Sequence, residues 1–178
     1  MNNRTISLLG AVVLLSVTGS IAQAQCPSCS CLIPATASKL ITLVACKGTG
    51  CSADGGDSGG CAFGIKFDKQ QNPNGTQTVP FAGVPSGQVL VITDLEWNAT
   101  GVTASNRIRA SVTAQTSLTV FSTLLNDSEA SDSGGRVGGS ISSPHGSFIK
   151  SGKSLCFNIS TSFTTEEATI HGFLAPDS

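Results

Sequence analysis

Beyond the first 24 residues, apolar side chains recur at every second position or in short runs, separated by glycine, proline, asparagine and serine. A period of two places alternate side chains on opposite faces of an extended chain, so the pattern predicts β-strands. Helix signals are nearly absent, and turn-forming sequences such as Asn72-Pro73-Asn74-Gly75 fill the gaps. The expected strands lie near Lys39–Ala45, Ala62–Phe67, Thr76–Phe81, Gln88–Trp97, Arg107–Ala114, Ser117–Leu124, Arg136–Ser142, Ser147–Ile149, Leu155–Thr161 and Ala168–Leu174.

This many short strands in one domain-sized segment predict an all-β fold, an antiparallel β-sandwich of jelly-roll type. The C-terminal stretch Ile170-His171-Gly172-Phe173-Leu174 resembles the last strand of the C1q and tumour-necrosis-factor jelly rolls, in which Gly-Phe-Leu is frequent. The resemblance covers five residues, and it implies a jelly-roll topology rather than any particular partner.

One hairpin is predicted in register, between the strands Gln88–Trp97 and Arg107–Ala114. An antiparallel alignment that places Glu96 opposite Arg107 also places Asp94 opposite Arg109 and aligns the apolar side chains of both strands. A slip of one residue would exchange the two faces, so charge and hydrophobicity favour this single alignment. These four charges are interpreted as register ion pairs. A catalytic role for the two acids is disfavoured because neighbouring arginines would keep both carboxylates ionised.

Residues 1–24 are typical of a secretory signal peptide, with Arg4 followed by an apolar stretch and the Ala22-Gln23-Ala24 cleavage pattern. The apolar stretch Ile6–Val17 is shorter than the roughly 20 residues of a membrane span. An N-terminal membrane anchor is the alternative. Cleavage would leave a Cys-rich segment, 25–37, and a single β-sandwich domain, 38–178. We therefore expect a secreted protein, periplasmic or extracellular, with no membrane span after cleavage.

Only 12% of the residues are charged, about half the usual fraction, and the formal net charge is -1. Disordered charged tails and coiled coils need more charge, and nucleic-acid binding needs a basic surface. These classes are excluded. The chain instead carries 43 serine and threonine residues.

Seven cysteines follow the predicted cleavage site, and in an exported chain they indicate disulfides before metal ligands. Seven is odd, so at least one thiol is left over. The best candidate is Cys156, as a buried apolar side chain, and the alternative is a link between two chains. A bridge from Cys51 to Cys61 would close the loop between them. The disulfide candidates are Cys26, Cys29, Cys31, Cys46, Cys51, Cys61 and Cys156.

The string Gly56-Asp57-Ser58-Gly59-Gly60 resembles the sequence around the nucleophile of chymotrypsin-like serine proteases, which implies Ser58 as a nucleophile. The likeness ends there, because Cys61 replaces the proline that follows in that family. Both histidines, His145 and His171, come after the serine instead of before it. The favoured interpretation is a flexible glycine-rich loop.

Asp54 and Asp57 in the same loop are weak candidates for Ca²⁺ ligands, because hard cations prefer oxygen donors. No other cofactor is expected. A second acidic loop, Asn126–Asp132, is interpreted as a solvated turn. His145 is expected in an exposed turn, and His171 as a structural histidine in the last strand.

The most favoured function is that of an exported, non-enzymatic β-sandwich used for extracellular or surface binding or assembly, in a structural or adhesive role. Low surface charge and exposed strand edges favour self-association, and another extracellular protein or a glycan is the alternative partner. Trp97 lies on the apolar face, so it is expected in the core rather than at a sugar platform. Two further hypotheses remain open: a small secreted serine-type hydrolase around Ser58, and a binding module that depends on calcium or carbohydrate.

Overall fold

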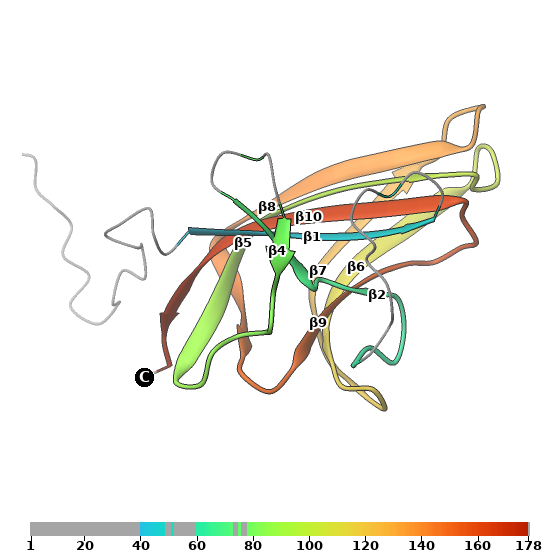
Figure 1. The fold of residues 1–178 in the computed structure, drawn as a ribbon. Helices are drawn as coiled ribbons and strands as arrows, with labels where there is room; N and C mark the ends of the chain where they lie inside the picture. Colours follow the sequence, from blue (N-terminus) through green and yellow to red (C-terminus); the bar gives the residue numbers. More distant parts are fainter. Residues whose placement is uncertain (1–39, 49–50, 52–59, 73–74, 76–77, 178) are drawn as a thin grey trace, which may run out of the picture. The chain divides into compact units, whose positions relative to one another are not determined.

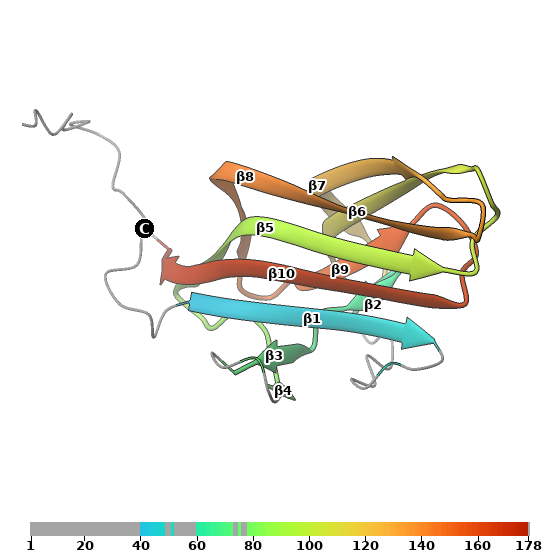
Figure 2. The same ribbon diagram turned by 90° about the horizontal axis from the view of Figure 1, so that it is seen from above.

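The computed structural model describes residues 40–48, 51, 60–72, 75 and 78–177, all within the compact unit that begins at Leu32. These residues form two antiparallel sheets packed face to face (Figures 1 and 2). The strands are β1 Leu40–Gly48, β2 Ile65–Lys66, β3 Lys69–Gln71, β4 Thr78–Pro80, β5 Gln88–Thr100, β6 Arg107–Gln115, β7 Val120–Ala130, β8 Arg136–Lys150, β9 Ser154–Ile159 and β10 Thr165–Pro176. The predicted all-β sandwich is confirmed.

The six-stranded sheet has the order β4-β3-β1-β10-β5-β8, and the four-stranded sheet has the order β2-β9-β6-β7. Most connections cross from one sheet to the other, so strands that follow each other in sequence seldom pair. The exceptions are the hairpin β6–β7 and the short β3–β4 pair. Apart from the short β3 and β4, successive strands change sheet at every step but one, β6 to β7, as in a jelly roll. In this arrangement the first and last strands, β1 and β10, lie side by side.

The predicted hairpin between β5 and β6 is wrong. β5 pairs with β10 and β8, whereas β6 pairs with β7 and β9 in the opposite sheet. Glu96 therefore lies between Thr169 and Ser140, and Asp94 between His171 and Ser142. The physical reason is that the apolar faces of the two strands meet across the core, not along a shared ladder.

The two arginines have other partners than the predicted acids. Arg107 donates from Nε to the Ser128 hydroxyl and from Nη2 to the Ser128 carbonyl, each at 2.9 Å. In the backbone ladder Arg109 lies opposite Ser128, and its N–H donates to the Ser160 hydroxyl at 2.9 Å. None of the four charged residues forms the predicted register ion pairs.

Two strand boundaries also differ from the prediction. Arg136–Ser142 and Ser147–Ile149 are parts of one strand, β8, and the turn expected at Pro144-His145-Gly146 is an irregularity within it. Gly146 adopts a φ of 69°, which glycine tolerates without steric cost. Most of the acidic segment Asn126–Asp132 belongs to β7, because β6 offers it a full ladder of backbone partners.

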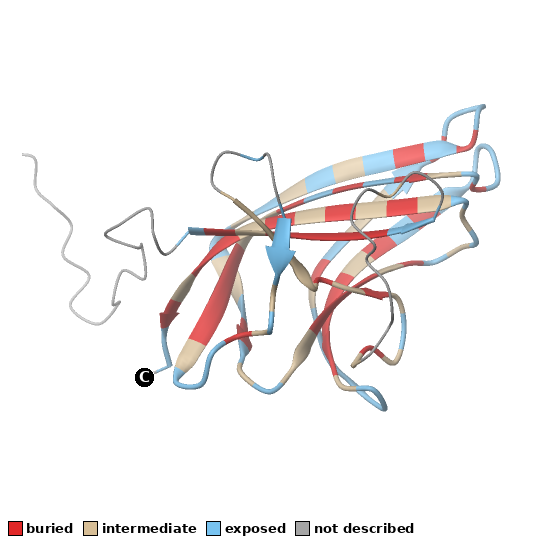
Figure 3. Cartoon of the chain, viewed as in Figure 1, coloured by how far each residue is buried: buried red, intermediate tan, exposed pale blue. Residues whose placement is uncertain are grey.

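The core lies between the sheets and is formed by the inward-facing residues of both (Figure 3). Trp97 is buried there, as predicted, and its ring centroid lies 6.2 Å from that of Phe157. Its indole N–H donates to the Asp127 carboxylate at 2.9 Å, so its buried polar group has a partner. Among the described residues, no helix has the length and apolar character needed to cross a membrane.

Two disulfides join described cysteines: Cys46 to Cys51, and Cys61 to Cys156. Two expectations are therefore wrong, since Cys156 is paired and Cys51 does not bridge to Cys61. Cys156 is buried, as expected, but its place in β9 brings it to the segment that leads into β2. Cys26, Cys29 and Cys31 lie outside the described residues.

Candidate functional site

The outer face of the six-stranded sheet carries side chains that alternate with the core residues of the same strands. In β5, for example, Leu95 and Trp97 point into the core, so Asp94, Glu96 and Asn98 lie on the outer face. Figure 2 shows the four longest strands of this sheet side by side. From β1 through β10 and β5 to β8, four paired rows are Leu40, Phe173, Val91 and Phe148; Thr42, His171, Asp94 and Ser142; Val44, Thr169, Glu96 and Ser140; and Cys46, Glu167, Asn98 and Gly138.

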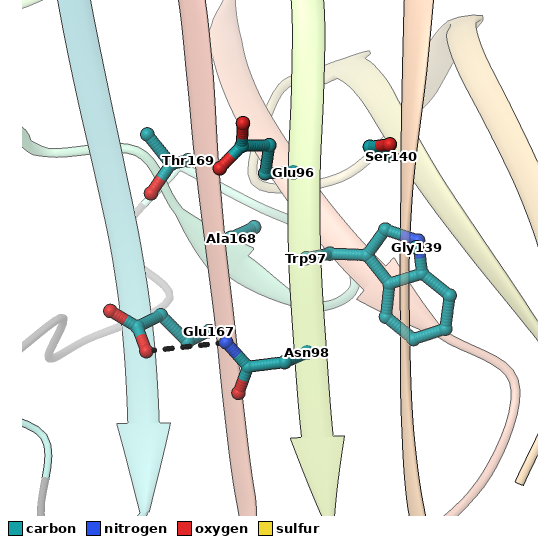
Figure 4. Close-up of a pocket in the computed structure, with 8 residues that line it drawn as sticks. All are labelled: Glu96, Trp97, Asn98, Gly139, Ser140, Glu167, Ala168 and Thr169. Atoms are coloured by element: carbon teal, nitrogen blue, oxygen red, sulfur yellow. Dashed lines mark hydrogen bonds between the residues drawn. The ribbon is translucent and has the colours of Figure 1, made fainter.

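A hollow of about 550 Å³ lies over the last two of these rows (Figure 4). Its polar lining consists of the carboxylates of Glu96 and Glu167, the amide of Asn98 and the hydroxyls of Ser140 and Thr169. Asn98 Nδ2 donates to Glu167 Oε2 at 3.4 Å, which orients both side chains. The hollow can therefore accept and donate hydrogen bonds over a broad surface, and its two carboxylates favour donors on the partner.

The neighbouring row, Thr42, His171, Asp94 and Ser142, contains two separate side-chain hydrogen bonds. The Thr42 hydroxyl lies 3.0 Å from His171 Nδ1, and the Ser142 hydroxyl donates to Asp94 Oδ1 at 2.7 Å. The hydrogen bonds from Ser142 and Thr93, together with the nearby His171, lower the pKa of Asp94 below its usual value of 3.8. This row resembles an acid–histidine–hydroxyl set. However, the strands' N–H groups are engaged in the ladder, and an oxyanion hole needs free donors.

The row of Leu40, Phe173, Val91 and Phe148 is apolar. Phe148 is 63% exposed and Leu40 is 58% exposed, while Val91 and Phe173 between them are buried. Val91 and Phe173 form a small cluster with Val89 and Ala175, separate from the main core. A bulge in β5, where Thr93 has no partner in the ladder, marks the boundary between the polar rows and the apolar row. The outer face therefore combines two apolar side chains in contact with solvent and a polar hollow.

A buried acid, Glu166, lies on the opposite, inner side of β10. Its side chain is 1% exposed, and its Oε1 has no hydrogen-bond partner. Burial raises the pKa of Glu166 to about 7, against the opposing charge of Lys47. Sequence reasoning missed this group, although Glu166 continues the inward alternation of Ala168 and Ile170 and so could have been found.

The sequence-predicted site residues do not gather into one site. Asp54, Asp57 and Ser58 lie outside the described residues, so the calcium and hydrolase hypotheses remain predictions. His145 is exposed in β8, and His171 is half-buried in β10. Within the part of the chain that the structure describes, no three His, Cys, Asp or Glu side chains form a group that could hold a metal ion.

No family model, curated protein or solved structure matches this chain. A function must therefore be argued from the geometry of its surfaces. The outer face of β1, β10, β5 and β8 offers the hollow described above and, beyond the row that contains His171, the exposed side chains of Leu40 and Phe148. Such a surface can hold a partner by apolar contact and side-chain hydrogen bonds.

Proposed function

We propose that the protein is an exported, non-enzymatic β-sandwich that works by binding or assembly, with the outer face of β1, β10, β5 and β8 as its contact surface. The partner we infer first is a second copy of the chain, and another extracellular protein is the alternative. The observation that carries the proposal is that one sheet face bears both the exposed side chains of Leu40 and Phe148 and the polar hollow.

Apolar side chains exposed on the same face as an organised polar surface are a common feature of protein contact surfaces. Interfaces combine a few buried aromatic anchors with a polar surround that supplies hydrogen bonds. Phe148 and Leu40 suit the first role, since full burial of each side chain contributes roughly 1.5–3 kcal/mol. Glu96, Asn98 and Thr169 suit the second, because they line the hollow with acceptors and donors.

The location outside the cytoplasm is supported by the disulfides. Bridges such as Cys46–Cys51 and Cys61–Cys156 persist in oxidising compartments. The predicted signal peptide points the same way. A structural or adhesive role fits a face that offers the hydroxyl side chains of Thr42, Ser140, Ser142 and Thr169 for hydrogen bonds.

Sedimentation velocity over a range of protein concentrations tests this proposal. We expect the wild type to form a reversible oligomer, and Phe148→Ser to weaken it by about tenfold or more, as for an interface anchor. Val79→Ser is the matched control, because Val79 is 43% exposed on β4, away from the four rows. It should leave the oligomer unchanged.

A wild type that stays monomeric at all concentrations would exclude a second copy as the partner. Equal weakening by Phe148→Ser and Val79→Ser would exclude this face as the surface. Phe148 is largely exposed, so its substitution should leave the unfolding transition intact, which fluorescence of Trp97 can check.

A further inference from the structure

A second group of exposed apolar side chains lies in the other sheet, at the turn between β6 and β7. Leu118 is 89% exposed, Phe121 52%, Val120 40%, and the nearby Phe63 64%. We call these four residues the apolar end. The turn is closed by reciprocal backbone hydrogen bonds between Thr116 and Thr119, at 2.8 and 3.3 Å. Figure 1 shows this turn at the same end of the sandwich as the β8–β9 turn.

Phe63 is held beside the turn by Gln115, the last residue of β6. The side-chain oxygen of Gln115 accepts hydrogen bonds from the N–H groups of Ala62 and Phe63, at 2.8 and 3.0 Å. Its amide nitrogen donates to the Phe63 carbonyl at 3.1 Å. Gln115 is buried, and the Cys61–Cys156 disulfide fixes the same segment. The exposure of Phe63 is therefore built into the fold.

Two lysines accompany the apolar end. Lys153 Nζ lies 3.3 Å from the centroid of the Phe121 ring, a cation–π contact. Lys153 and Lys66 also line a pocket of about 210 Å³. The other walls of this pocket are mostly apolar, from Phe67, Phe81, Val84, Ile149 and Leu155. Two lysines thus line a pocket whose other walls are mostly apolar.

The remaining described charges near this end leave it positive. Lys150 forms an ion pair of 2.9 Å with Asp177, and the two charges offset each other. Asp68 lies close by, since its carbonyl accepts a hydrogen bond from the N–H of Phe81, a pocket residue. Lys66 and Lys153 together outweigh that single acid.

We propose that the apolar end docks on an anionic lipid surface, with the exposed side chains among the acyl chains and the two lysines at the headgroups. Peripheral membrane binding needs an apolar element that enters the interface and basic residues that attract anionic lipid. The apolar end supplies the first, and Lys66 and Lys153 supply the second. Charge complementarity is what selects anionic lipid over a neutral apolar partner.

Co-sedimentation with phosphatidylglycerol vesicles and with phosphatidylcholine vesicles tests the proposal. We expect the wild type to bind the anionic vesicles more strongly, and added salt to weaken that binding. Leu118→Ser/Phe121→Ser should lower the partition coefficient by about tenfold or more, because lost apolar burial weakens interfacial binding. The matched control is Val79→Ser, which removes an exposed apolar side chain from β4 in the other sheet, outside both proposed surfaces, and should not alter it.

Lys66→Gln/Lys153→Gln should reduce binding to the anionic vesicles severalfold and lessen its salt dependence, because each substitution removes one attraction to the anionic headgroups. Arg107→Gln/Arg136→Gln, which removes two exposed charges elsewhere, is its control and should have no effect. The proposal fails if the wild type binds neither kind of vesicle at low salt. It also fails if the Leu118/Phe121 variant binds as well as the wild type, or if the protein binds inorganic phosphate but not vesicles. An oligomer abolished by Leu118→Ser/Phe121→Ser would identify the apolar end as a protein contact and overturn it as well.

Discussion

Among the described residues, Glu166 is the buried one that carries an ionisable carboxyl group. It lies inside the sandwich near the start of β10, with one carboxylate oxygen that has no hydrogen-bond partner. The charged form is disfavoured there, because a low-dielectric interior solvates an anion poorly. Lys47, opposite Glu166 in the ladder, offsets only part of this effect. The folded protein therefore keeps a proton that the unfolded chain releases.

This proton gives stability a definite pH dependence. The pKa of Glu166 is about 7 in the folded protein, against the usual 4.5 that we take for the unfolded chain. The folded state therefore binds more protons between these two pH values. Because stability falls with rising pH where the folded state holds more protons, we expect a loss of about 3 kcal/mol from pH 4.5 to 7. Glu166→Gln should remove most of this slope in urea unfolding followed by Trp97 fluorescence.

Glu167→Gln is the control for that measurement. Glu167 is the next residue in β10 but faces outward, where Asn98 hydrogen-bonds to it. Its substitution should leave the slope as in the wild type. A wild-type protein equally stable at pH 4.5 and pH 7 would contradict the assignment to Glu166.

At the scale of elements, the strands could be predicted from periodicity, but their neighbours could not. Alternation identifies the apolar face of a strand, as with Leu95 and Ile108, and both do point into the core. It does not distinguish two strands that share a ladder from two strands that face each other across the core. The expected pairing of Glu96 with Arg107 failed for this reason.

The separation of β5 from β6 can be tested with a double-mutant cycle. Glu96→Arg and Arg107→Glu should show no rescue when combined, because the two residues lie in different sheets. We expect their effects on the free energy of unfolding to add within about 0.5 kcal/mol. A coupling energy well above this value, with the double variant more stable than either single one, would support the β5–β6 hairpin and contradict the observed topology.

Other features of the molecule could not be predicted from the sequence either, because they depend on contacts between distant residues. The pairing of Cys61 with Cys156 joins residues 95 positions apart, and no local pattern selects it among the alternatives. The apolar row escaped the sequence argument because an extra residue in β5, Thr93, moves Val91 to the outer face, where Phe173 lies opposite it. The sequence pattern did single out Asp94 and Glu96, but it predicted that they form ion pairs with arginines, not that they lie on the outer face.

At the scale of the whole molecule, two separate surfaces expose apolar side chains. One surface, the outer face of the six-stranded sheet, joins hydroxyls, an amide and two carboxylates to the exposed Phe148 and Leu40. A separate surface, the apolar end, lies in the other sheet beside two lysines. The proposals for contact and for lipid docking therefore involve different residues, and each can fail while the other stands.

Carboxyl footprinting tests the central proposal, contact through the outer face, most directly. Glu96 and Glu167 lie in the hollow, whereas Glu129 and Asp132 are exposed at the end of β7 and in the turn that follows it. With a carbodiimide and an amine label, we expect Glu96 and Glu167 to react less as protein concentration rises, while Glu129 and Asp132 react equally throughout. Unchanged labelling of Glu96 and Glu167, or protection of Glu129 and Asp132 instead, would contradict the account.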